Sequence, residues 1–523
     1  MMKKLFLLFL LTSFVEIFPQ LRPESFDLNK TNYLNKISDA NPISNSIGEI
    51  ITIGDTVWIG TSRGVSVSFD RGENWTNFYR TDPFGEDGIS AIGYYNGTFW
   101  AATSIEVEIT GGASVPKGTG LKYTTDNGQN WTAIPQPLDN LNDTIVVYGI
   151  NQLRALPITV AEQSPTYDFA FTPGAVWITS WASGLRRSTD MGQTWQRMVL
   201  PSDSLNSIKP TDTLDFCYSP SAGSYCSKRW LNHVSFSVIA PNDSTVYVGT
   251  ADGINKTTNA GALYPGWVKY NHLNESESIS GNFVNGMGYN YSNNTIWAST
   301  RKAEGETEFD GVSYSADGGS SWKTFLDGER TFNFGFKDED VIVAGETGVF
   351  RSSNQGITWI QPNNIVDRNS GVELSTNYFI CAGAEEGNGY WDVWLGSADG
   401  LARLRETAFW QGEWKIYLAS QKLASERSTY CYPNPYSPKL DQLKIKYSTG
   451  GKDASVTIRV FDFGMHYIRT VIQNAPRNKT IESPPEFWDG RDDSGKILPN
   501  GVYFYRVDVN DEEPLFGKII YLQ

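Results

Sequence analysis

One eight-residue pattern, Ser/Thr-x-Asp-x-Gly-x-x-Trp, recurs along this 523-residue chain, and we call it the box. Full copies occupy residues 68–75, 124–131, 188–195 and 315–322; residues 352–359 carry Asn in place of Asp, and the copy at 257–261 reaches its Trp only at 267. Hydroxyl and carboxylate side chains accept hydrogen bonds from backbone N–H groups of a turn, and Gly tolerates a positive φ. Each copy therefore predicts a tight turn, and its recurrence predicts a repeat architecture. The residues given this structural role are Ser68, Asp70, Gly72, Trp75, Asp126, Gly128, Trp131, Asp190, Gly192, Trp195, Asp317, Gly319, Trp322, Gly356 and Trp359.

The segments around the box predict four short strands per repeat. Two apolar strands joined by a Gly-containing turn precede it, as in residues 57–68 and 245–257, another apolar run precedes those, and the Trp opens a further strand. Units of four strands are typical of β-propeller blades. Tryptophans at the outer-strand position predict seven blades over residues 44–418, with six or eight as alternatives: Trp75, Trp131, Trp195, Trp267, Trp322, Trp359 and Trp414. Residues 21–43 are expected to add a closing strand to the last blade. The fold class is all-β.

The box resembles the Asp-box, or BNR repeat, of sialidase-like β-propellers. The repeats are also similar to those of periplasmic sensor propellers of two-component regulators and of photosystem assembly-factor propellers. The resemblance implies that the box lies at the turn between the third and fourth strands of a blade, away from the central channel. The turns between second and third strands then emerge on the opposite face.

That opposite face is predicted to carry the binding site. The long insertions, at residues 105–119, 135–165, 201–232, 271–282 and 301–311, fall in its turns and connections. Loops on a rigid scaffold are where binding residues concentrate. The candidate ligand-binding residues are Arg63, Glu106, Trp181, Asp252, Arg301, Glu346 and Asp399, of which Trp181 is singled out because it stands in a turn of small residues.

The last ninety or so residues differ in character. Residues 419–429 are a polar connector, and residues 430–523 contain alternating strand patterns with the motifs Tyr432-Pro-Asn-Pro435 and Trp488-Asp-Gly-Arg-Asp492. This segment resembles the Ig-like domain of flagellar hook-capping proteins, which recurs at the C-termini of proteins exported by the bacterial type IX route. The resemblance implies an Ig-like β-sandwich that serves sorting or surface attachment and contacts type IX-like secretion machinery.

Bulk properties exclude several functions. Residues 1–20 read as a signal peptide, and no other segment is apolar enough to span a membrane, so a secreted or bacterial outer-surface protein is expected. The net charge of −15 disfavours nucleic acid as a partner. With three scattered His residues, no metal site or cofactor is predicted. Of the four cysteines, Cys217 and Cys226 share one loop and are a candidate disulfide.

Two functions compete. The preferred one is a non-catalytic propeller that binds a protein partner or a surface glycan through the loop-rich face. The alternative is a sialidase-like glycoside hydrolase that uses loop carboxylates, and it requires two carboxyl groups set across a cleft. The Arg-Ile-Pro motif that sialidases show before their first box is missing, since the nearest candidates, Leu21-Arg-Pro23 and Arg154-Ala-Leu-Pro157, do not fit. Nothing in the sequence selects a catalytic pair, so catalysis is left open, with binding favoured.

Overall fold

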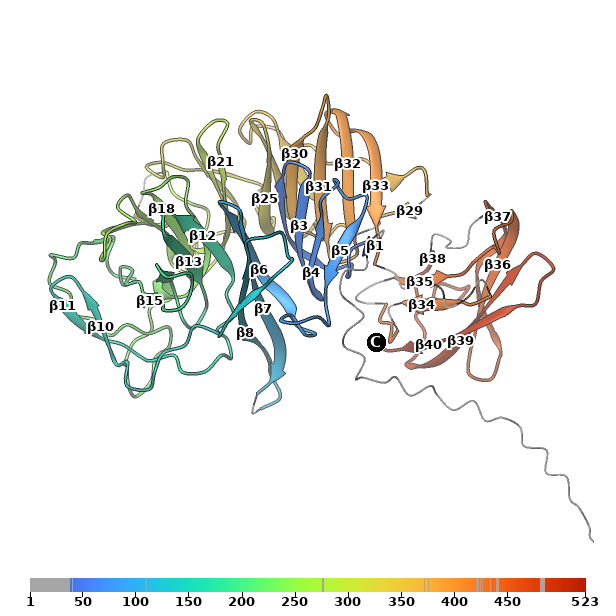
Figure 1. The fold of residues 1–523 in the computed structure, drawn as a ribbon, viewed down its shortest axis with the longest axis horizontal. Helices are drawn as coiled ribbons and strands as arrows, with labels where there is room; N and C mark the ends of the chain where they lie inside the picture. The colour runs from blue at the N-terminus through green and yellow to red at the C-terminus, as the bar shows by residue number, and fades with distance from the viewer. Residues whose placement is uncertain are drawn as a thin grey trace, which may run out of the picture. The chain divides into compact units, whose positions relative to one another are not determined.

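The structure is a computed structural model. It describes residues 38–523 except 40, 110, 275–276, 371, 375, 420–422, 424, 426, 433, 439–441 and 480–484. The predicted signal peptide lies outside the described residues. The regular elements in the described part of the chain are strands (Figure 1), apart from one short 3-10 helix, η1 (Leu231–His233).

Seven antiparallel sheets follow one another in the described chain up to residue 417. The first contains β1 (Ser38–Asp39), β2 (Ile47–Ile53), β3 (Thr56–Thr61), β4 (Gly64–Ser68) and β5 (Trp75–Phe78). The second contains β6 (Gly88–Tyr95), β7 (Thr98–Glu108), β8 (Ser114–Thr124) and β9 (Thr132–Ile134), and the third β12 (Asp168–Thr172), β13 (Ala175–Thr179), β14 (Arg186–Ser188) and β15 (Gln196–Arg197). The fourth contains β16 (Ser207–Ile208), β17 (Ser235–Ile239), β18 (Val246–Thr250), β19 (Gly253–Thr257) and β20 (Trp267–Tyr270).

The remaining three sheets continue the same up-and-down order. The fifth contains β21 (Phe283–Asn290), β22 (Thr295–Arg301), β23 (Gly311–Ser315) and β24 (Lys323–Phe325); the sixth β25 (Thr331–Lys337), β26 (Asp340–Gly345) and β27 (Val349–Ser352); the seventh β30 (Phe379–Glu386), β31 (Trp391–Ser397), β32 (Leu401–Ala408) and β33 (Gln411–Tyr417). Two hairpins lie in the connections, β10 (Ile145–Tyr148) with β11 (Asn151–Arg154) and β28 (Val366–Asp367) with β29 (Val372–Glu373).

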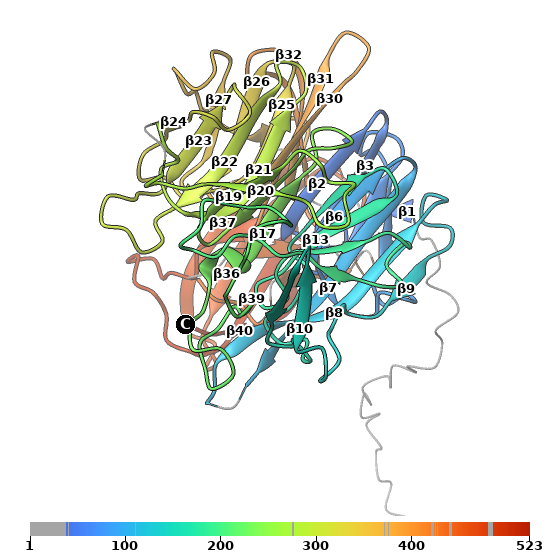
Figure 2. The ribbon, with the colours of Figure 1, turned by 90° about the vertical axis from the view of Figure 1, so that its left-hand side faces the viewer.

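The sheets are arranged around an axis. The innermost strand of each sheet contacts that of the next, in the order β2, β6, β12, β17, β21, β25 and β30, and β30 contacts β2 again. Figure 2 shows β17, β21 and β25 side by side. Because each sheet is covered by a neighbour on both faces, strands such as β4, β18 and β23 are buried at every position. Tight turns join consecutive strands within a sheet. Asn96 and Gly97, with φ of 47° and 80°, form the turn from β6 to β7.

The box forms the turn that sequence reasoning predicted. In the first copy Ser68 Oγ donates to Asp70 Oδ1 at 2.8 Å and accepts from Gly72 N at 2.7 Å, while Asn74 N donates to Asp70 Oδ1 at 2.8 Å. Hydrogen bonds from the residue four places later lower the pKa of Asp126 and of Asp190 to about 2. These carboxylates therefore stabilise the turns to which they belong.

The box also joins each sheet to the preceding one, which the sequence did not indicate. The Trp131 ring, from the box of the second sheet, lies 5.1 Å from the Phe78 ring of the first sheet. The box Gly lies equally close to the preceding sheet: a Cβ on Gly128 would lie 2.6 Å from Phe78, and one on Gly356 would lie 2.4 Å from Phe325. Only glycine fits there, because the backbone φ is positive as well.

Contacts between the first and seventh sheets close the ring, where β2 contacts β30 and β31. Arg71 pairs with Asp392 at 3.1 Å, and Glu73 pairs with Arg403 at 3.1 Å and with Lys415 at 2.8 Å. Residues 21–43 were expected to add a strand to the last sheet. Their described strand, β1, instead pairs with β5, the outer strand of the first sheet.

Beyond residue 429, two sheets share a separate core. One contains β34 (Tyr430–Tyr432), β35 (Leu443–Lys446) and β38 (Glu486–Trp488); the other contains β36 (Ala454–Phe461), β37 (Tyr467–Arg477), β39 (Gly501–Val509) and β40 (Leu515–Tyr521). Their facing side chains, among them Ile445, Ile458, Trp488 and Tyr505, form one buried cluster. The segment is a two-sheet sandwich.

Cys217 and Cys226 form a disulfide, with Cα atoms 5.7 Å apart. The bond closes a loop in the long connection between β16 and β17 of the fourth sheet. Cys381 is buried in β30, where its thiol lies 3.7 Å from the carbonyl oxygen of Ile47 in β2.

Candidate binding site at the axial channel

The innermost strands share an irregularity that shapes the axis of the molecule. In six of them the pairing with the second strand skips one residue near the strand start, which is a β-bulge. A bulge bends the strand and re-aims a side chain. The skipped residues all line the axial cavity: Gly48, Ser90, Phe236, Asn285, Phe332 and Ile380.

This axial cavity has a volume of about 660 Å³ and is lined by residues from all seven sheets. Its lining includes nine aromatic residues: Tyr94, Tyr95, Tyr167, Phe169, Phe171, Phe236, Tyr289, Tyr291 and Phe332. It also includes three carboxyl groups, from Glu49, Asp168 and Asp243, whereas none of the lining residues is Lys, Arg or His. The channel is therefore an aromatic cavity that contains carboxyl groups and no basic residue.

Two of the carboxyl groups are held by the backbone of neighbouring sheets. Glu49 on β2 accepts a hydrogen bond from Ile92 N on β6 at 2.7 Å, and Asp168 on β12 accepts one from Val238 N on β17 at 2.8 Å. Burial raises the pKa of Glu49 well above its usual range, and the charge of Asp168 adds to this. Burial also raises the pKa of Asp168 to about 7. Burial therefore disfavours the ionised form of both carboxyl groups.

Aromatic side chains gather at the end of the channel where the innermost strands begin. Phe236 lies 5.7 Å from the ring of Tyr167 and 4.5 Å from that of Phe283. Phe332 lies 5.1 Å from the ring of Tyr378, and the Arg301 guanidinium stands 5.1 Å above the Phe332 ring. We call this group the aromatic rim. Each innermost strand begins at the same end of its sheet as the turn between the second and third strands. The aromatic rim is therefore on the insertion-bearing face, opposite the box turns.

The structure brings three of the predicted ligand residues to the aromatic rim. Arg301 packs on Phe332, and the negative charge of Glu346 acts on Arg301, whose pKa is lowered mainly by burial. Glu106 lies near enough to Tyr167 to add to the rise that burial causes in the pKa of that phenol. Ser114 donates a hydrogen bond to Glu106 at 2.9 Å.

Trp181 lies beside this group. It is partly buried, in a turn whose Ser180 carbonyl accepts a hydrogen bond from Ser235 N at the start of β17. The neighbouring residue on β17 is Phe236, a member of the aromatic rim.

The other predicted residues have different roles. Asp252 pairs with Lys269 at 2.5 Å, and burial raises its pKa to about 6 against the opposing effect of that lysine. Asp399 pairs with Lys444 of the C-terminal segment. Each of these two carboxylates pairs with a fully buried lysine. Arg63 is exposed in the turn between β3 and β4, where its backbone N–H bonds to Thr61 Oγ1 at 3.0 Å.

Sequence reasoning missed Glu49 and Asp168. Both are acids inside otherwise apolar strands, in the runs 47–53 and 167–172, and this pattern is the signal that could have identified them. Across the described residues, no three His, Cys, Asp or Glu side chains gather closely enough to hold a metal ion.

Seven sheets whose first strands surround a cavity define a β-propeller. Neither a family model nor a curated protein matches the chain. Within the residues that the structure describes, no helix combines the length and the apolar composition needed to cross a membrane.

Solved structures resemble the chain at low identity. PorZ, a surface component of the type IX secretion system of Porphyromonas gingivalis, is 14% identical over 91% of this chain and 66% of PorZ, with a TM-score of 0.30. The chain thus spans just under two thirds of PorZ. YCF48 from Cyanidioschyzon merolae is 12% identical over 69% of this chain and 92% of its own, with a TM-score of 0.38. The extracellular domain of a putative hybrid two-component system from B. thetaiotaomicron is 9% identical over 91% and 81%, with a TM-score of 0.28.

Proposed function

We propose that the chain is a seven-bladed, Asp-box β-propeller followed by an Ig-like module, and that it acts as a binding protein at the bacterial cell surface. The seven sheets would be the blades, and the two-sheet sandwich beyond residue 429 would be the type IX-like sorting or attachment module. The supporting features are the repeated box, the Tyr432-Pro-Asn-Pro435 and Trp488-Asp-Gly-Arg-Asp492 motifs, and the separate core of the sandwich.

The proposed ligand is a protein partner that inserts a Lys or Arg side chain into the axial channel. The observation that carries this proposal is the lining of the channel, which has three carboxyl groups, nine aromatic rings and no basic residue. Ammonium and guanidinium groups are attracted to the faces of aromatic rings and to carboxylates, and a cation placed beside a carboxyl group favours its ionised form. A cavity of this volume lies in the usual range for ligand sites. The aromatic rim, with Glu106, Trp181, Arg301 and Glu346, would contact the partner outside the channel.

Glu49 and Asp168 are also the pair that a sialidase-like hydrolase would need in a cavity. Each already accepts a hydrogen bond from a backbone N–H of a neighbouring innermost strand. This bond fixes the orientation of the carboxyl group, which suits a binding role. Release of the leaving group from an aryl sialoside or aryl hexoside by the wild-type protein, lost in Asp168→Asn, would establish the hydrolase instead.

The test is to fill the channel without disturbing the backbone. Gly48 has no positive φ, and a Cβ there would meet only the Gly60 carbonyl oxygen, at 3.8 Å. Equivalent bulge positions carry Phe236 and Phe332, so Gly48→Phe fits the local backbone and places a ring in the cavity beside Glu49. Gly261→Phe is the matched control, because its Cβ meets nothing within 4 Å and the residue is exposed in the box turn of the fourth sheet.

Calorimetric titration with a hexa-arginine peptide and a hexa-glutamate peptide provides the readout. The wild-type protein and Gly261→Phe should bind hexa-arginine, and Gly48→Phe should bind it at least about tenfold more weakly with an unchanged melting temperature. Equal binding by Gly48→Phe would place the interaction on the outer surface. Binding of hexa-glutamate, or of neither peptide, would contradict the proposal.

A further inference from the structure

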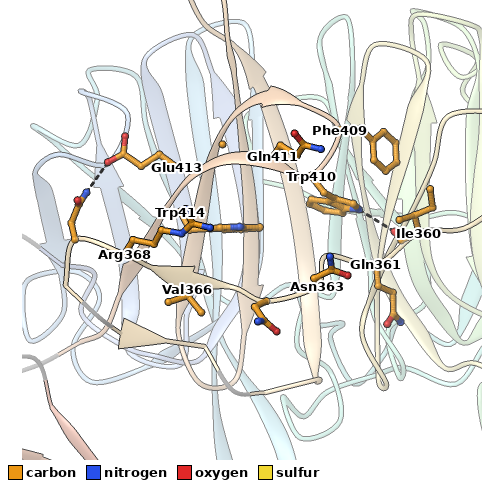
Figure 3. Close-up of a pocket in the computed structure, with 13 residues that line it drawn as sticks. Ile360, Gln361, Asn363, Val366, Arg368, Phe409, Trp410, Gln411, Glu413 and Trp414 are labelled. Carbon is orange, nitrogen blue, oxygen red and sulfur yellow. Dashed lines mark hydrogen bonds between the residues drawn. The ribbon is translucent and has the colours of Figure 1, made fainter.

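A second cavity, of about 920 Å³, lies on the outside of the sixth and seventh sheets. The tip of the hairpin between β32 and β33 forms one wall, and the segment from Ile360 to Asn369 forms the other (Figure 3). We call it the outer groove. It shares no lining residue with the axial channel, so a ligand of the outer groove is independent of any ligand of the channel.

The outer groove exists because the sixth sheet has no full outer strand. The box Trp359 is followed by a single bridge between Ile360 and Arg351, and the chain then leaves the sheet. The hairpin of β28 and β29 lies instead beside β33 of the seventh sheet. The space that a regular fourth strand would fill is left open to solvent.

Trp410 is held in position at the hairpin tip. Its φ is 55°, a left-handed conformation that is uncommon for a bulky residue. Its backbone N–H donates to Glu406 Oε1 at 2.6 Å, and its indole N–H donates to the Ile360 carbonyl oxygen at 3.0 Å. Strained positions persist where the surroundings over-determine them, and such positions concentrate at binding sites.

A buried ion cluster supports this arrangement from below. Glu406 accepts from Arg351 and from Lys337, each at 2.6 Å, and both Glu406 and Arg351 are almost completely buried. The Arg351 guanidinium lies 4.3 Å from the Phe409 ring and 5.4 Å from the Trp410 ring. The indole of Trp410 is thus fixed before any ligand arrives, which reduces the entropy cost of binding.

The two tryptophans of the outer groove have nearly parallel rings. The rings of Trp410 and Trp414 are 6.3 Å apart and inclined by only 21°. Figure 3 shows them side by side and nearly edge-on, with Asn363 and Val366 on one side and Gln411 and Glu413 on the other. Trp410 is partly exposed, while Trp414 is largely buried.

The polar lining of the outer groove is dominated by amides. Five Asn and Gln side chains line it, Gln361, Asn363, Asn364, Asn369 and Gln411, and only Arg368 and Glu413 carry charge. Amides donate and accept hydrogen bonds, as sugar hydroxyl groups do. The opposite charges cancel, so the lining selects neither an anion nor a cation, and a purely apolar ligand would leave the amides unsatisfied.

We propose that the outer groove binds a neutral saccharide, with the apolar face of one sugar ring on the partly exposed indole of Trp410 and its hydroxyl groups on the surrounding amides. Indole presents a large flat apolar surface at low conformational cost, and sugar C–H groups make weak favourable contacts with it. The amides then set the orientation of the ring.

The experiment uses the full chain and neutral hexasaccharides of glucose, mannose and N-acetylglucosamine, with a hexagalacturonate as the charged comparison. Trp410→Ala removes the exposed indole. The double substitution Asn363→Ala with Gln411→Ala removes only amides at the groove surface and leaves the ion cluster intact. Phe463→Ala is the control, because Phe463 is an aromatic residue that is 75% exposed on the C-terminal sandwich. Binding is followed by calorimetry and by tryptophan fluorescence.

We expect at least one neutral hexasaccharide to bind with a Kd below about 1 mM, and both groove variants to weaken it at least about tenfold. Phe463→Ala should bind as the wild type does. The amide variant decides the question if Trp410→Ala proves poorly folded. The proposal is overturned if no neutral hexasaccharide binds at about 5 mM, if both groove variants bind normally, or if only the galacturonate binds.

Discussion

Replacement of Gly72 by alanine tests how the ring is closed. Gly72 belongs to the box of the first sheet, with φ of 85°, and a Cβ there would lie 2.5 Å from Trp394 Cη2 and 2.5 Å from Tyr417 Oη. Both aromatic residues belong to the seventh sheet and are almost completely buried. The substitution therefore forces the first and last sheets apart at their junction.

The expected loss of stability has two parts. A left-handed backbone conformation costs an alanine about 1–2 kcal/mol, and overpacking a well-filled interior costs about 1–3 kcal/mol, so that together they amount to about 2–5 kcal/mol. Gly54→Ala is a matched control, since Gly54 has φ of 57° and a Cβ there would meet nothing within 4 Å. It carries only the conformational part, so the difference between the two variants measures the packing between sheets.

Urea unfolding of the two variants and the wild-type protein gives this difference. A third protein, Gly72→Ala with Tyr417→Phe, removes one of the two colliding atoms. Tyr417 Oη is buried and has no hydrogen-bond partner in the described part of the chain, so the phenylalanine itself should cost little. We expect the double variant to recover part of the loss, and hydrogen exchange in β2 and β30 to rise in Gly72→Ala. The reasoning is refuted if Gly72→Ala and Gly54→Ala unfold alike, or if Tyr417→Phe recovers nothing.

Two further predictions concern the channel and the C-terminal sandwich. Because burial raises the pKa of Asp168 to about 7, the folded state keeps a proton that an unfolded carboxyl with a pKa of 3.8 releases, and the folded state is therefore progressively destabilised as the pH rises from about 4 to about 7. Asp168→Asn should therefore gain stability relative to the wild type between about pH 4 and about pH 7, as measured by thermal unfolding, and parallel pH profiles would contradict the assignment. Deletion of residues 430–523 should leave a folded propeller that is not delivered to the cell surface, as judged by circular dichroism and cell fractionation, and normal surface delivery would refute the sorting role.

The strand order was largely predictable because its signals are local. An apolar run, a glycine turn and the box follow one another within about twenty residues, and each pairing joins neighbouring segments. The all-β propeller follows from that repetition. The role of the box in joining sheets was not predictable, because the atoms that Gly72 meets belong to Trp394 and Tyr417, at the other end of the propeller sequence.

The candidate ligand residues show the same division between local and long-range information. Glu106, Arg301 and Glu346 come near the aromatic rim because they lie at or beside the ends of second strands on the predicted face. Asp252 and Asp399 occupy similar turns, but each meets a lysine that belongs to another strand or segment. A turn carboxylate is visible in a sequence, whereas the cation that neutralises it is not.

The axial channel was missed because a β-bulge leaves almost no trace in the sequence. A one-residue bulge changes which side chain faces the axis, so a strict alternation of residues assigns Gly48, Phe236 and Phe332 to the wrong surface. Glu49 and Asp168 were nevertheless detectable as acids within apolar strands. A buried acid is retained at a cost unless it is partnered, and here the partners are backbone N–H groups of the next innermost strands. The box carboxylates are satisfied by their own turns, whereas these two still face an open cavity, and that difference makes the channel, rather than the box, the place to look for a ligand.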